Sequence, residues 1–336
     1  MAATIKDVAR LAGCSIKTVS RVINNEPYVT EETRARVNSA IRELNFAPNI
    51  SARRLVQQRS FVIGILLLAG GYGQSELLSR LMETGYEYHY DFLVQTYFPT
   101  STTSKEKLAR LVRERRVDGL VTTPPCDMDD YIAGLVVQSG IPLVRINPYD
   151  RLIDLPYVAE DDFQGARSLT AHLIGLGHRR IAFFKGPRNH RMSADRYLGY
   201  KAALEEHGLP VRPELVKNSE FNFDGGYTAA RLVIEEDPAP TAIFAGSDEA
   251  ALGAIFAMQE AGRRMPEDIS IAGFDDLAHA KEVWPGLTSV SVPYNVIVER
   301  ATLMLIDLLN GKTVDQPQVV YPTRLVVRGS TAAVET

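Results

Sequence analysis

From Phe61 onward, short apolar runs alternate with amphipathic helical segments, and this alternation constrains the fold more than any other feature of the sequence. The apolar runs are Phe61–Leu68, Phe92–Thr96, Val117–Thr122, Leu143–Ile146, Arg180–Phe184, Thr241–Ala245 and Ile269–Gly273. The helical segments lie near 75–89, 103–115, 128–139, 162–176, 192–207, 224–236 and 247–262. Repeated strand–helix–strand alternation predicts α/β architecture, with parallel sheets covered by helices on both faces.

The length of this part of the chain favours two sheets over one. A last helix is expected over Val296–Asn310, followed by two short strands, Gln318–Tyr321 and Arg324–Val327. Roughly 270 residues are many for a single open sheet, so we expect two similar lobes with a cleft between them. Ligands of open α/β sheets bind beyond the carboxyl ends of the strands, which makes this cleft the expected ligand site.

The first 45 residues predict a separate unit of three short helices. The helices are expected over 5–12, 16–24 and 31–44, after the capping residues Thr4, Ser15 and Thr30. Gly13 ends the first helix, because glycine readily adopts the left-handed turn conformation. Apolar residues at helical spacing form the expected core, namely Val8, Leu11, Val19, Val22, Val37, Ile41 and Leu44.

The charges of the chain are unevenly distributed. Residues 1–59 hold ten Lys or Arg against five Asp or Glu, whereas the remainder holds 27 against 36. A basic N-terminal region on an otherwise acidic chain is suited to contact the phosphates of a nucleic acid. The charge distribution is equally consistent with an ordinary solvated surface.

The order helix, glycine-containing turn, helix is that of a helix-turn-helix. Its second helix would enter the major groove of DNA and present polar side chains near its start. Val19 and Val22 belong to the core, and the residues left to face DNA are Ile16, Lys17, Thr18, Ser20 and Arg21. Lys and Arg can read guanine, and Ile16 can contact a thymine methyl. The pattern alone leaves a small protein-interaction domain as the alternative.

Motifs along the whole chain resemble the lactose/galactose repressor (LacI/GalR) family. The N-terminal ones are Thr4–Ser15, Thr18–Asn24, Tyr28–Arg34, Pro48-Asn49, Ala52-Arg53 and Leu55. The later ones are Val117–Leu120, Gly177–Ala182, Arg196 with Gly199-Tyr200, Ser247-Asp248 with Ala251–Gly253, and Gly273–Asp276. One departure is Cys14, where the family usually has Val, and a small buried thiol can replace it.

The resemblance implies a sequence-specific regulator, expected to act as a repressor and to bind a near-palindromic double-stranded operator as a homodimer. Its domains would be a helix-turn-helix (1–48), a hinge helix or linker (49–60) and an effector-binding core (61–330). The hinge would fold only on DNA, with Leu55 wedged into a base step, and a disordered linker is the alternative. The implied DNA-binding residues are Thr4, Ser15, Ile16, Lys17, Thr18, Ser20, Arg21, Asn24, Asn49, Ala52 and Leu55.

The resemblance also implies a core like that of periplasmic sugar-binding proteins. Two lobes would be joined by three crossings, expected near 157–162, 287–291 and 321–324. Lobe one would hold 61–158 and 291–321, and lobe two would hold 162–288 and 324–330. The effector, expected to be a sugar, would lie between the lobes and control operator affinity allosterically.

Effector contacts carry over position by position. Arg196 matches an arginine that grips effector oxygens, and Asp275 matches a carboxylate that accepts effector hydroxyls. An internal ion pair or a helix cap is the alternative for both. Phe221 lies where an aromatic ring often stacks on the ligand, and a core role is equally open for it. The remaining candidates are Thr123, Asn147, Ser247 and Tyr72.

These remaining candidates rest on weaker ground. Capping is the default role of Thr123 and Ser247. Tyr72 falls in a glycine-rich loop, 69–74, that departs from the family's pattern.

The motifs of common enzymes are incomplete in this sequence. Residues 71–76 lack the third glycine of a dinucleotide loop, and Gly311-Lys312-Thr313 lacks the earlier glycine of a phosphate loop. The adjacent carboxylates Asp161-Asp162 and Asp275-Asp276 are interpreted as a cap followed by a solvated neighbour. The histidines and the two cysteines show no metal-ligand spacing, so we expect no enzyme, cofactor, metal or disulfide.

The sequence also favours a cytoplasmic location. No apolar run reaches the ~18 residues of a membrane helix, and the N-terminus lacks the pattern of a signal peptide. A solute-carrying binding protein would need an export signal and no basic N-terminal region. A sugar-processing enzyme is the third class, and turnover of a candidate sugar would favour it.

Overall fold

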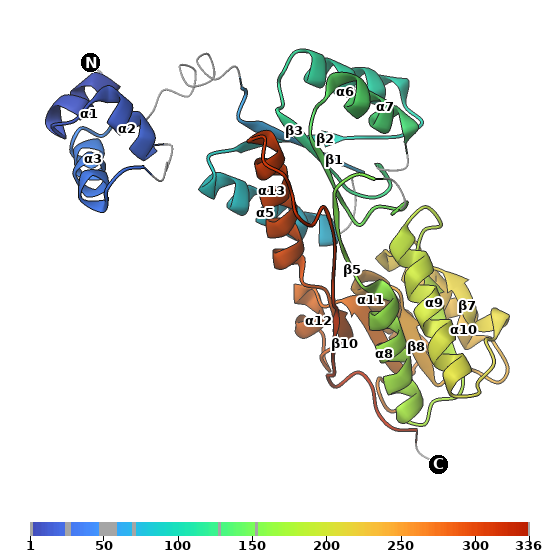
Figure 1. Cartoon of the computed structure of the whole chain (residues 1–336). Coiled ribbons are helices and arrows are strands. Elements are labelled where there is room, and N and C mark those ends of the chain that lie inside the picture. Colours follow the sequence, from blue (N-terminus) through green and yellow to red (C-terminus); the bar gives the residue numbers. More distant parts are fainter. Residues whose placement is uncertain are drawn as a thin grey trace. The chain divides into compact units, whose positions relative to one another are not determined.

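The computed structural model describes residues 3–23, 28–46, 59–68, 72–126, 129–151 and 154–334, without the side chains of 72–74. The chain divides into two compact units, residues 1–60 and 61–336 (Figure 1). No helix among the described residues has the length and apolar character needed to span a bilayer.

The first unit contains the three predicted helices, α1 (Ile5–Leu11), α2 (Ile16–Ile23) and α3 (Glu31–Glu43). The Ser15 hydroxyl accepts a hydrogen bond from the Thr18 amide, and Gly13 has a positive φ of 62°, as a left-handed turn requires. The buried core residues are Val8, Ala9, Ala12, Val19, Val22, Val37 and Ala40. The prediction of Leu11 as a core residue was wrong. It is exposed, because the buried side of α1 follows Val8 and Ala9 instead.

The second unit is built on two six-stranded sheets. The first sheet has the order β11-β5-β4-β3-β1-β2, with β1 (Val62–Leu67), β2 (Asp91–Thr96), β3 (Gly119–Thr122), β4 (Leu143–Ile146), β5 (Tyr157–Glu160) and β11 (Gln318–Tyr321). The second has the order β12-β10-β9-β8-β6-β7, with β6 (Ile181–Lys185), β7 (Val216–Asn218), β8 (Ala242–Ala245), β9 (Ser270–Asp275), β10 (Thr288–Ser291) and β12 (Arg324–Val326). Of the described pairs, only β10–β12 is antiparallel, so the expected α/β class with two parallel-dominated sheets is confirmed.

Helices flank each sheet (Figure 1). Lobe one, defined here by the first sheet, carries α5 (Tyr72–Glu87), α6 (Thr102–Arg113), α7 (Asp130–Ser139) and α13 (Tyr294–Leu309). Lobe two, defined by the second sheet, carries α8 (Asp162–Gly175), α9 (Arg191–Glu206), the short 3-10 helix η2 (Pro213–Leu215), α10 (Phe223–Ile234), α11 (Asp248–Glu260) and α12 (Ala278–Glu282). Within lobe one, α13 packs against α5, β3, β4 and β5, although it lies far from them in sequence.

The described chain passes between the two sheets three times, after β5, after β10 and after β11. A crossing was predicted near 287–291, but Thr288–Ser291 forms β10 and pairs with β9 and β12 of the second sheet. The crossing therefore falls at Val292-Pro293. The short strand was not foreseen because its sequence, Thr-Ser-Val-Ser, has a single aliphatic residue.

Candidate functional site

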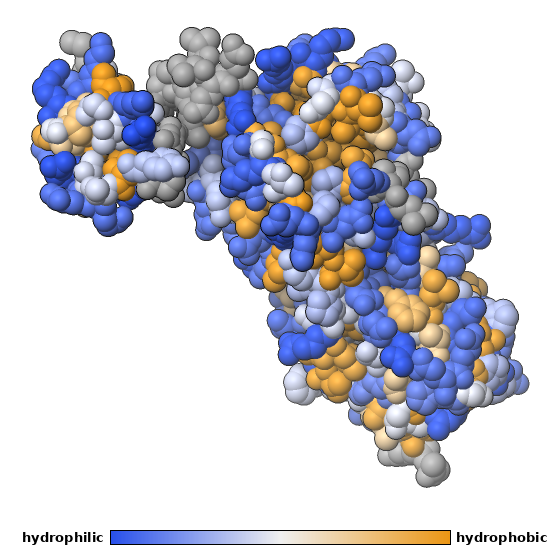
Figure 2. All heavy atoms as spheres, viewed as in Figure 1, coloured by the Kyte–Doolittle hydropathy of each residue, from blue (hydrophilic) through white to orange (hydrophobic). Residues whose placement is uncertain are grey.

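The start of α2 forms one candidate site, on the first unit. Ser15, Ile16 and Lys17 are exposed, whereas Val19 and Val22 are buried. Thr18, Ser20 and Arg21 are half-buried on the same helix. Much of the visible surface of this unit is hydrophilic (Figure 2). Ile16 differs from this surface, because it is a large apolar residue that is 46 % exposed.

The electrostatics of α2 suit an anionic partner. Its first turn contains no acidic residue, and its last turn carries Arg21. The positive end of the helix dipole is therefore not neutralised by a carboxylate within the helix. Thr4 is exposed at the start of α1, where its hydroxyl donates to the Asp7 carboxylate at 2.6 Å. The other predicted DNA contacts lie outside the described residues, namely Asn24, Asn49, Ala52 and Leu55.

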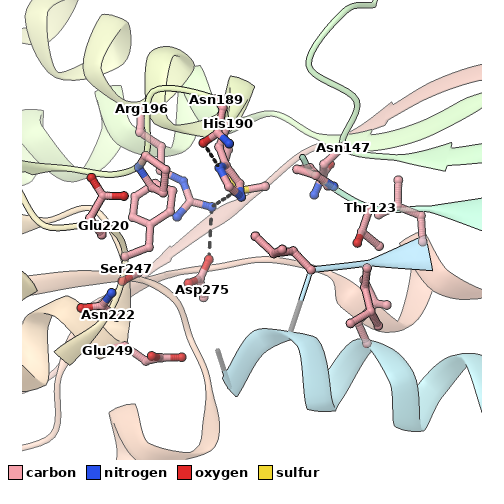
Figure 3. A pocket seen from close by; sticks show the side chains of 18 of the residues that line it. Thr123, Asn147, Asn189, His190, Arg196, Glu220, Asn222, Ser247, Glu249 and Asp275 are labelled. Atoms are coloured by element: carbon pink, nitrogen blue, oxygen red, sulfur yellow. Dashed lines mark hydrogen bonds and ion pairs between the residues drawn. The ribbon is translucent and has the colours of Figure 1, made fainter. Parts of the chain in front are cut away.

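A cavity of about 520 Å³ forms the second candidate site, at the carboxyl ends of strands from both sheets (Figure 3). Lobe one and the start of α13 contribute Leu67, Leu68, Leu77, Thr123, Pro124, Ile146, Asn147 and Tyr294. Lobe two contributes Pro187, Asn189, His190, Met192, Arg196, Glu220, Phe221, Asn222, Ser247, Glu249, Asp275 and Leu277. All the predicted effector contacts except Tyr72 therefore line one cavity. Tyr72 begins α5, and its side chain lies outside the described part.

Arg196, on α9, is held by the protein itself. Its Nε donates to Asp162 at 2.7 Å, its Nη1 donates to the Gly246 carbonyl at 2.6 Å, and its Nη2 donates to Asp275 at 3.1 Å. The guanidinium carbon lies 3.7 Å from the ring centre of Phe274, a close cation–π contact. The internal ion pair that the sequence left as an alternative is thus present in the structure.

Asp275 ends β9 and joins this ion pair to the cavity. Its Oδ1 accepts from Arg196 and, at 3.3 Å, from the Tyr294 hydroxyl, whereas its Oδ2 has no hydrogen-bond partner among the described residues. Burial raises the pKa of this carboxyl to about 6, although Arg196 opposes the shift. Asp275 therefore keeps one oxygen available to accept a hydrogen bond from a ligand.

Two buried carboxylates beside Arg196 were missed by the sequence analysis. Asp161 caps α8 as expected, accepting from the Gln164 amide, but Asp162 is buried and the interpretation of a solvated neighbour was wrong. Glu160 ends β5, and neither of its carboxylate oxygens has a hydrogen-bond partner among the described residues. Its Oε1 lies 4.0 Å from Nη2 of Arg196. Burial, reinforced by the charge of Asp162, raises the pKa of Glu160 to about 8.

The remaining predicted residues have structural roles that can coexist with ligand contact. Ser247 accepts from the Ala250 amide and so caps α11, while the Thr123 hydroxyl donates to the Leu66 carbonyl. Asn147 accepts from the Glu160 amide through Oδ1, which leaves its amide nitrogen on the cavity side of the bond. Ser247 thus has the capping role that the sequence gave as its default, whereas Thr123 binds a strand carbonyl and caps none of the described helices.

Phe221 is half-buried and lies over Arg196, with 5.1 Å between the ring centre and the guanidinium carbon. Gly186 leaves room for the ring, since a Cβ at this position would be 2.1 Å from it. Other lining residues that sequence reasoning missed are His190, Glu220, Asn222 and Glu249. The sequence could have indicated these residues by their position, because each follows a strand of the second sheet.

We expect Gly186→Ala to destabilise the core by about 1–3 kcal/mol, because the added methyl group forces the Phe221 ring away from Arg196. Urea unfolding of the full chain measures this change. Gly134→Ala is the matched control, since a Cβ on Gly134, within α7, meets no atom within 4 Å. The control should be neutral or stabilising by up to about 1 kcal/mol. Equal stabilities of the two variants would show that Phe221 is not confined by Gly186.

Comparison with known proteins gives consistent results over almost the full chain. Residues 4–49 match the model of bacterial regulatory proteins of the lacI family, and residues 170–331 match that of a periplasmic binding protein-like domain. Catabolite control protein A of Priestia megaterium is 34% identical in an alignment over 339 residues. The alignment covers 98% of this chain and 100% of that protein. The transcriptional repressor PurR of Pectobacterium carotovorum is also 34% identical, with 98% and 97% covered.

Solved structures of similar fold include regulators bound to ligands. A complex of the transcriptional regulator CelR with cellobiose superposes with a TM-score of 0.73 at 30% identity and covers 98% of this chain and 99% of that chain. A lac repressor dimer bound to operator and the anti-inducer ONPF superposes with a TM-score of 0.77 at 26% identity, covering 99% and 100%.

Proposed function

This chain belongs to the lacI family of bacterial regulatory proteins, and from that premise we propose a repressor whose affinity for an operator is controlled by a small hydroxylated effector, expected to be a sugar. Members of this family are DNA-binding transcriptional regulators rather than enzymes, and its repressors bind operators as dimers. The observation that carries the proposal is a cavity between two lobes in a chain that also exposes the start of α2.

On the DNA side, the exposed face of α2 supplies the reading groups. Lys17 is placed to donate to guanine, and Ile16 to contact a thymine methyl. The Ser15 and Thr18 hydroxyls, with the helix N-terminus, suit phosphates. A homodimer would present two such helices to successive major grooves of a near-palindromic operator. The proposed hinge over 49–60, including the Leu55 wedge, completes this contact.

On the effector side, the cavity supplies both donors and acceptors. Asp275 offers one carboxylate oxygen, Asn147 offers an amide nitrogen, and Phe221 offers a ring face. A ligand that contacts both lobes would favour one angle between them, and that angle would bias hinge folding. Such coupling typically amounts to ~1–3 kcal/mol and is reciprocal, so operator DNA would change effector affinity by the same factor. We place this regulation in the cytoplasm, where the operator would be found.

Selection of genomic fragments by the purified protein tests the DNA-binding half directly. We expect a near-palindromic sequence to be enriched at moderate ionic strength. If the protein prefers no genomic sequence over random duplex, with or without a panel of sugars and nucleobases, the proposal is wrong.

Lys17→Ala should weaken binding to the selected operator by 1–3 kcal/mol, about 5- to 150-fold, because it removes a base contact in the major groove. Its effect on random duplex should be small and removed by salt. Arg42→Ala is the control, since Arg42 is an exposed cation in the last turn of α3, away from the start of α2. Fluorescence anisotropy titrations on both DNAs measure the two affinities. Equal losses for the two variants would mean that Lys17 acts only as a surface charge.

A further inference from the structure

The side chains that line the cavity carry more negative than positive charge. The acidic ones are Glu220, Glu249 and Asp275, and Arg196 is the only Lys or Arg among the described lining residues. His190 also lines the cavity, but burial lowers the pKa of its ring to about 4, so it is neutral near pH 7. A ligand entering this cavity therefore meets acceptors and negative charge (Figure 3).

The charge of Arg196 is already paired with carboxylates of the protein. Its nitrogens already donate to Asp162, the Gly246 carbonyl and Asp275, at 2.6–3.1 Å. A phosphate or carboxylate that took the place of Asp162 or Asp275 would leave a buried carboxylate unpaired. The energetic penalty for an unpaired buried charge is several kcal/mol, which outweighs the gain of the exchange.

The wall behind Arg196 holds more carboxyl groups than cations and so offers no further positive charge to a ligand. Glu160, Asp162 and Asp275 all lie within 4.0 Å of the Arg196 guanidinium, so three carboxyl groups share one cation. Both carboxylate oxygens of Glu160 and Oδ2 of Asp162 lack a hydrogen-bond partner among the described residues. Burial raises the pKa of each of the three carboxyls, and the charge of Arg196 opposes these shifts without cancelling them.

At two helix starts beside the cavity, those of α10 and α11, the positive end of the helix dipole is already compensated. Helix N-termini often bind phosphate through free amides and the helix dipole. At α11, Ser247 caps the helix, and its first turn contains Asp248 and Glu249. At α10, Asn222 accepts from the Gly225 amide, and Asp224 lies in the first turn. Carboxylates within both helices already compensate the positive ends.

We propose that the cavity prefers a hydroxylated ligand that carries a positive charge over its neutral and anionic forms, and an amino sugar is the simplest such ligand. The inference rests on the proposed role of the cavity as the effector site. The ammonium group would lie against Oδ2 of Asp275, the carboxylate oxygen without a described protein partner. Ligand hydroxyls would accept from the amide nitrogens of Asn147 and Asn222.

The test uses the full chain and three matched sets of ligands. Glucose, galactose and mannose are compared with their 2-amino-2-deoxy forms and with their 6-phosphates by thermal shift and calorimetry at pH 7.5. We expect at least one amino sugar to raise the Tm and to bind ten-fold or more tightly than its neutral parent. Its affinity should fall between pH 7.5 and pH 5.5, as the carboxyl groups of the cluster take up protons. The 6-phosphates should bind more weakly than the amino forms.

Two glutamates at opposite ends of α10 provide a matched pair of variants. Glu220 lines the cavity before the helix, whereas Glu235 is exposed at the C-cap of the helix. Glu220→Gln should reduce the preference for the amino form over the neutral parent about three-fold or more, and Glu235→Gln should leave it unchanged. Equal effects of the two substitutions would assign the preference to the general charge of the protein and overturn the proposal.

The remaining outcomes separate this inference from the proposed function. A neutral or phosphorylated sugar that binds as tightly as the amino form overturns the charge preference. If that sugar also changes operator affinity, the regulatory proposal stands. A panel in which no ligand shifts the Tm overturns the charge preference too, whereas the genomic selection decides the regulatory proposal independently.

Discussion

Replacing Arg196 with methionine should lower the free energy of unfolding by about 3–5 kcal/mol, because it removes the cation that is paired with two buried carboxylates. Asp162 and Asp275 both lose their ion pair, and the Gly246 carbonyl loses its donor. Methionine retains much of the apolar stem of Arg196, so the loss reports chiefly the guanidinium, with its ion pairs and its contacts with Phe221 and Phe274. Urea unfolding of the full chain at pH 7.5, followed by far-UV circular dichroism, measures the change.

Arg191→Met is the control for this prediction. Arg191 lies on the same helix and pairs with Asp195 at 3.1 Å, but 39% of its side chain is exposed. Exposed pairs contribute at most about 1 kcal/mol. The Arg196→Met deficit should shrink when Asp162→Asn is added, since one uncompensated charge is then removed. A deficit no larger than that of the control would show that the buried cluster does not depend on Arg196.

Replacing Glu160 with glutamine should make the fold markedly less sensitive to pH. The pKa of Glu160 is about 8 in the folded chain and near its ordinary value of 4.5 when unfolded. Between these values the folded state holds a proton that the unfolded state releases, so stability falls as pH rises from about 4.5 through 8. The ionised side chain therefore destabilises the native state at alkaline pH, by an amount on the order of 2–4 kcal/mol.

The expected result is that Glu160→Gln matches the parent near pH 5 and exceeds its stability at pH 8–9. Asp162 and Asp275, whose pKa values are also raised by burial, keep a residual slope in the variant. Thermal and urea unfolding at intervals from pH 5 to pH 9 measure the two profiles. Glu83→Gln on α5, where the side chain is 63% exposed, should leave the parent profile intact. Parallel profiles for parent and Glu160→Gln would refute the buried-carboxylate account.

The regular features of the fold were predictable because they depend on local patterns. The apolar run of β1 and the helix starts at Ser15 and Thr30 follow from periodicity and capping. The strand β7, Val216–Asn218, was not predictable, since it is only three residues long and two of them are polar. Its place at the sheet edge depends on pairing with β6, which only the tertiary structure supplies.

The candidate cavity was predictable in position more than in chemistry. Two arguments predicted that one cleft is lined by Arg196, Asp275, Asn147 and Phe221. They were the family resemblance and the rule that ligands bind beyond the carboxyl ends of strands, and the structure places all four residues around one cavity. The sequence could not show that Arg196 is already engaged by three protein acceptors, because Asp162 is 34 residues away. Glu160 was missed for the same reason, since burial of a carboxylate depends on the elements packed around it.

The interleaved paths of the two lobes have a consequence for synthesis on the ribosome. The edge strand β11 pairs with β5, and α13 covers β3, β4 and β5, so lobe one needs residues 294–321 to be complete. Lobe two needs β12 beside β10 in the same way. Neither lobe can therefore close while the nascent chain lacks its last forty or so residues. Chains truncated near residue 290 should aggregate or be degraded rather than accumulate as a half-sized effector-binding domain.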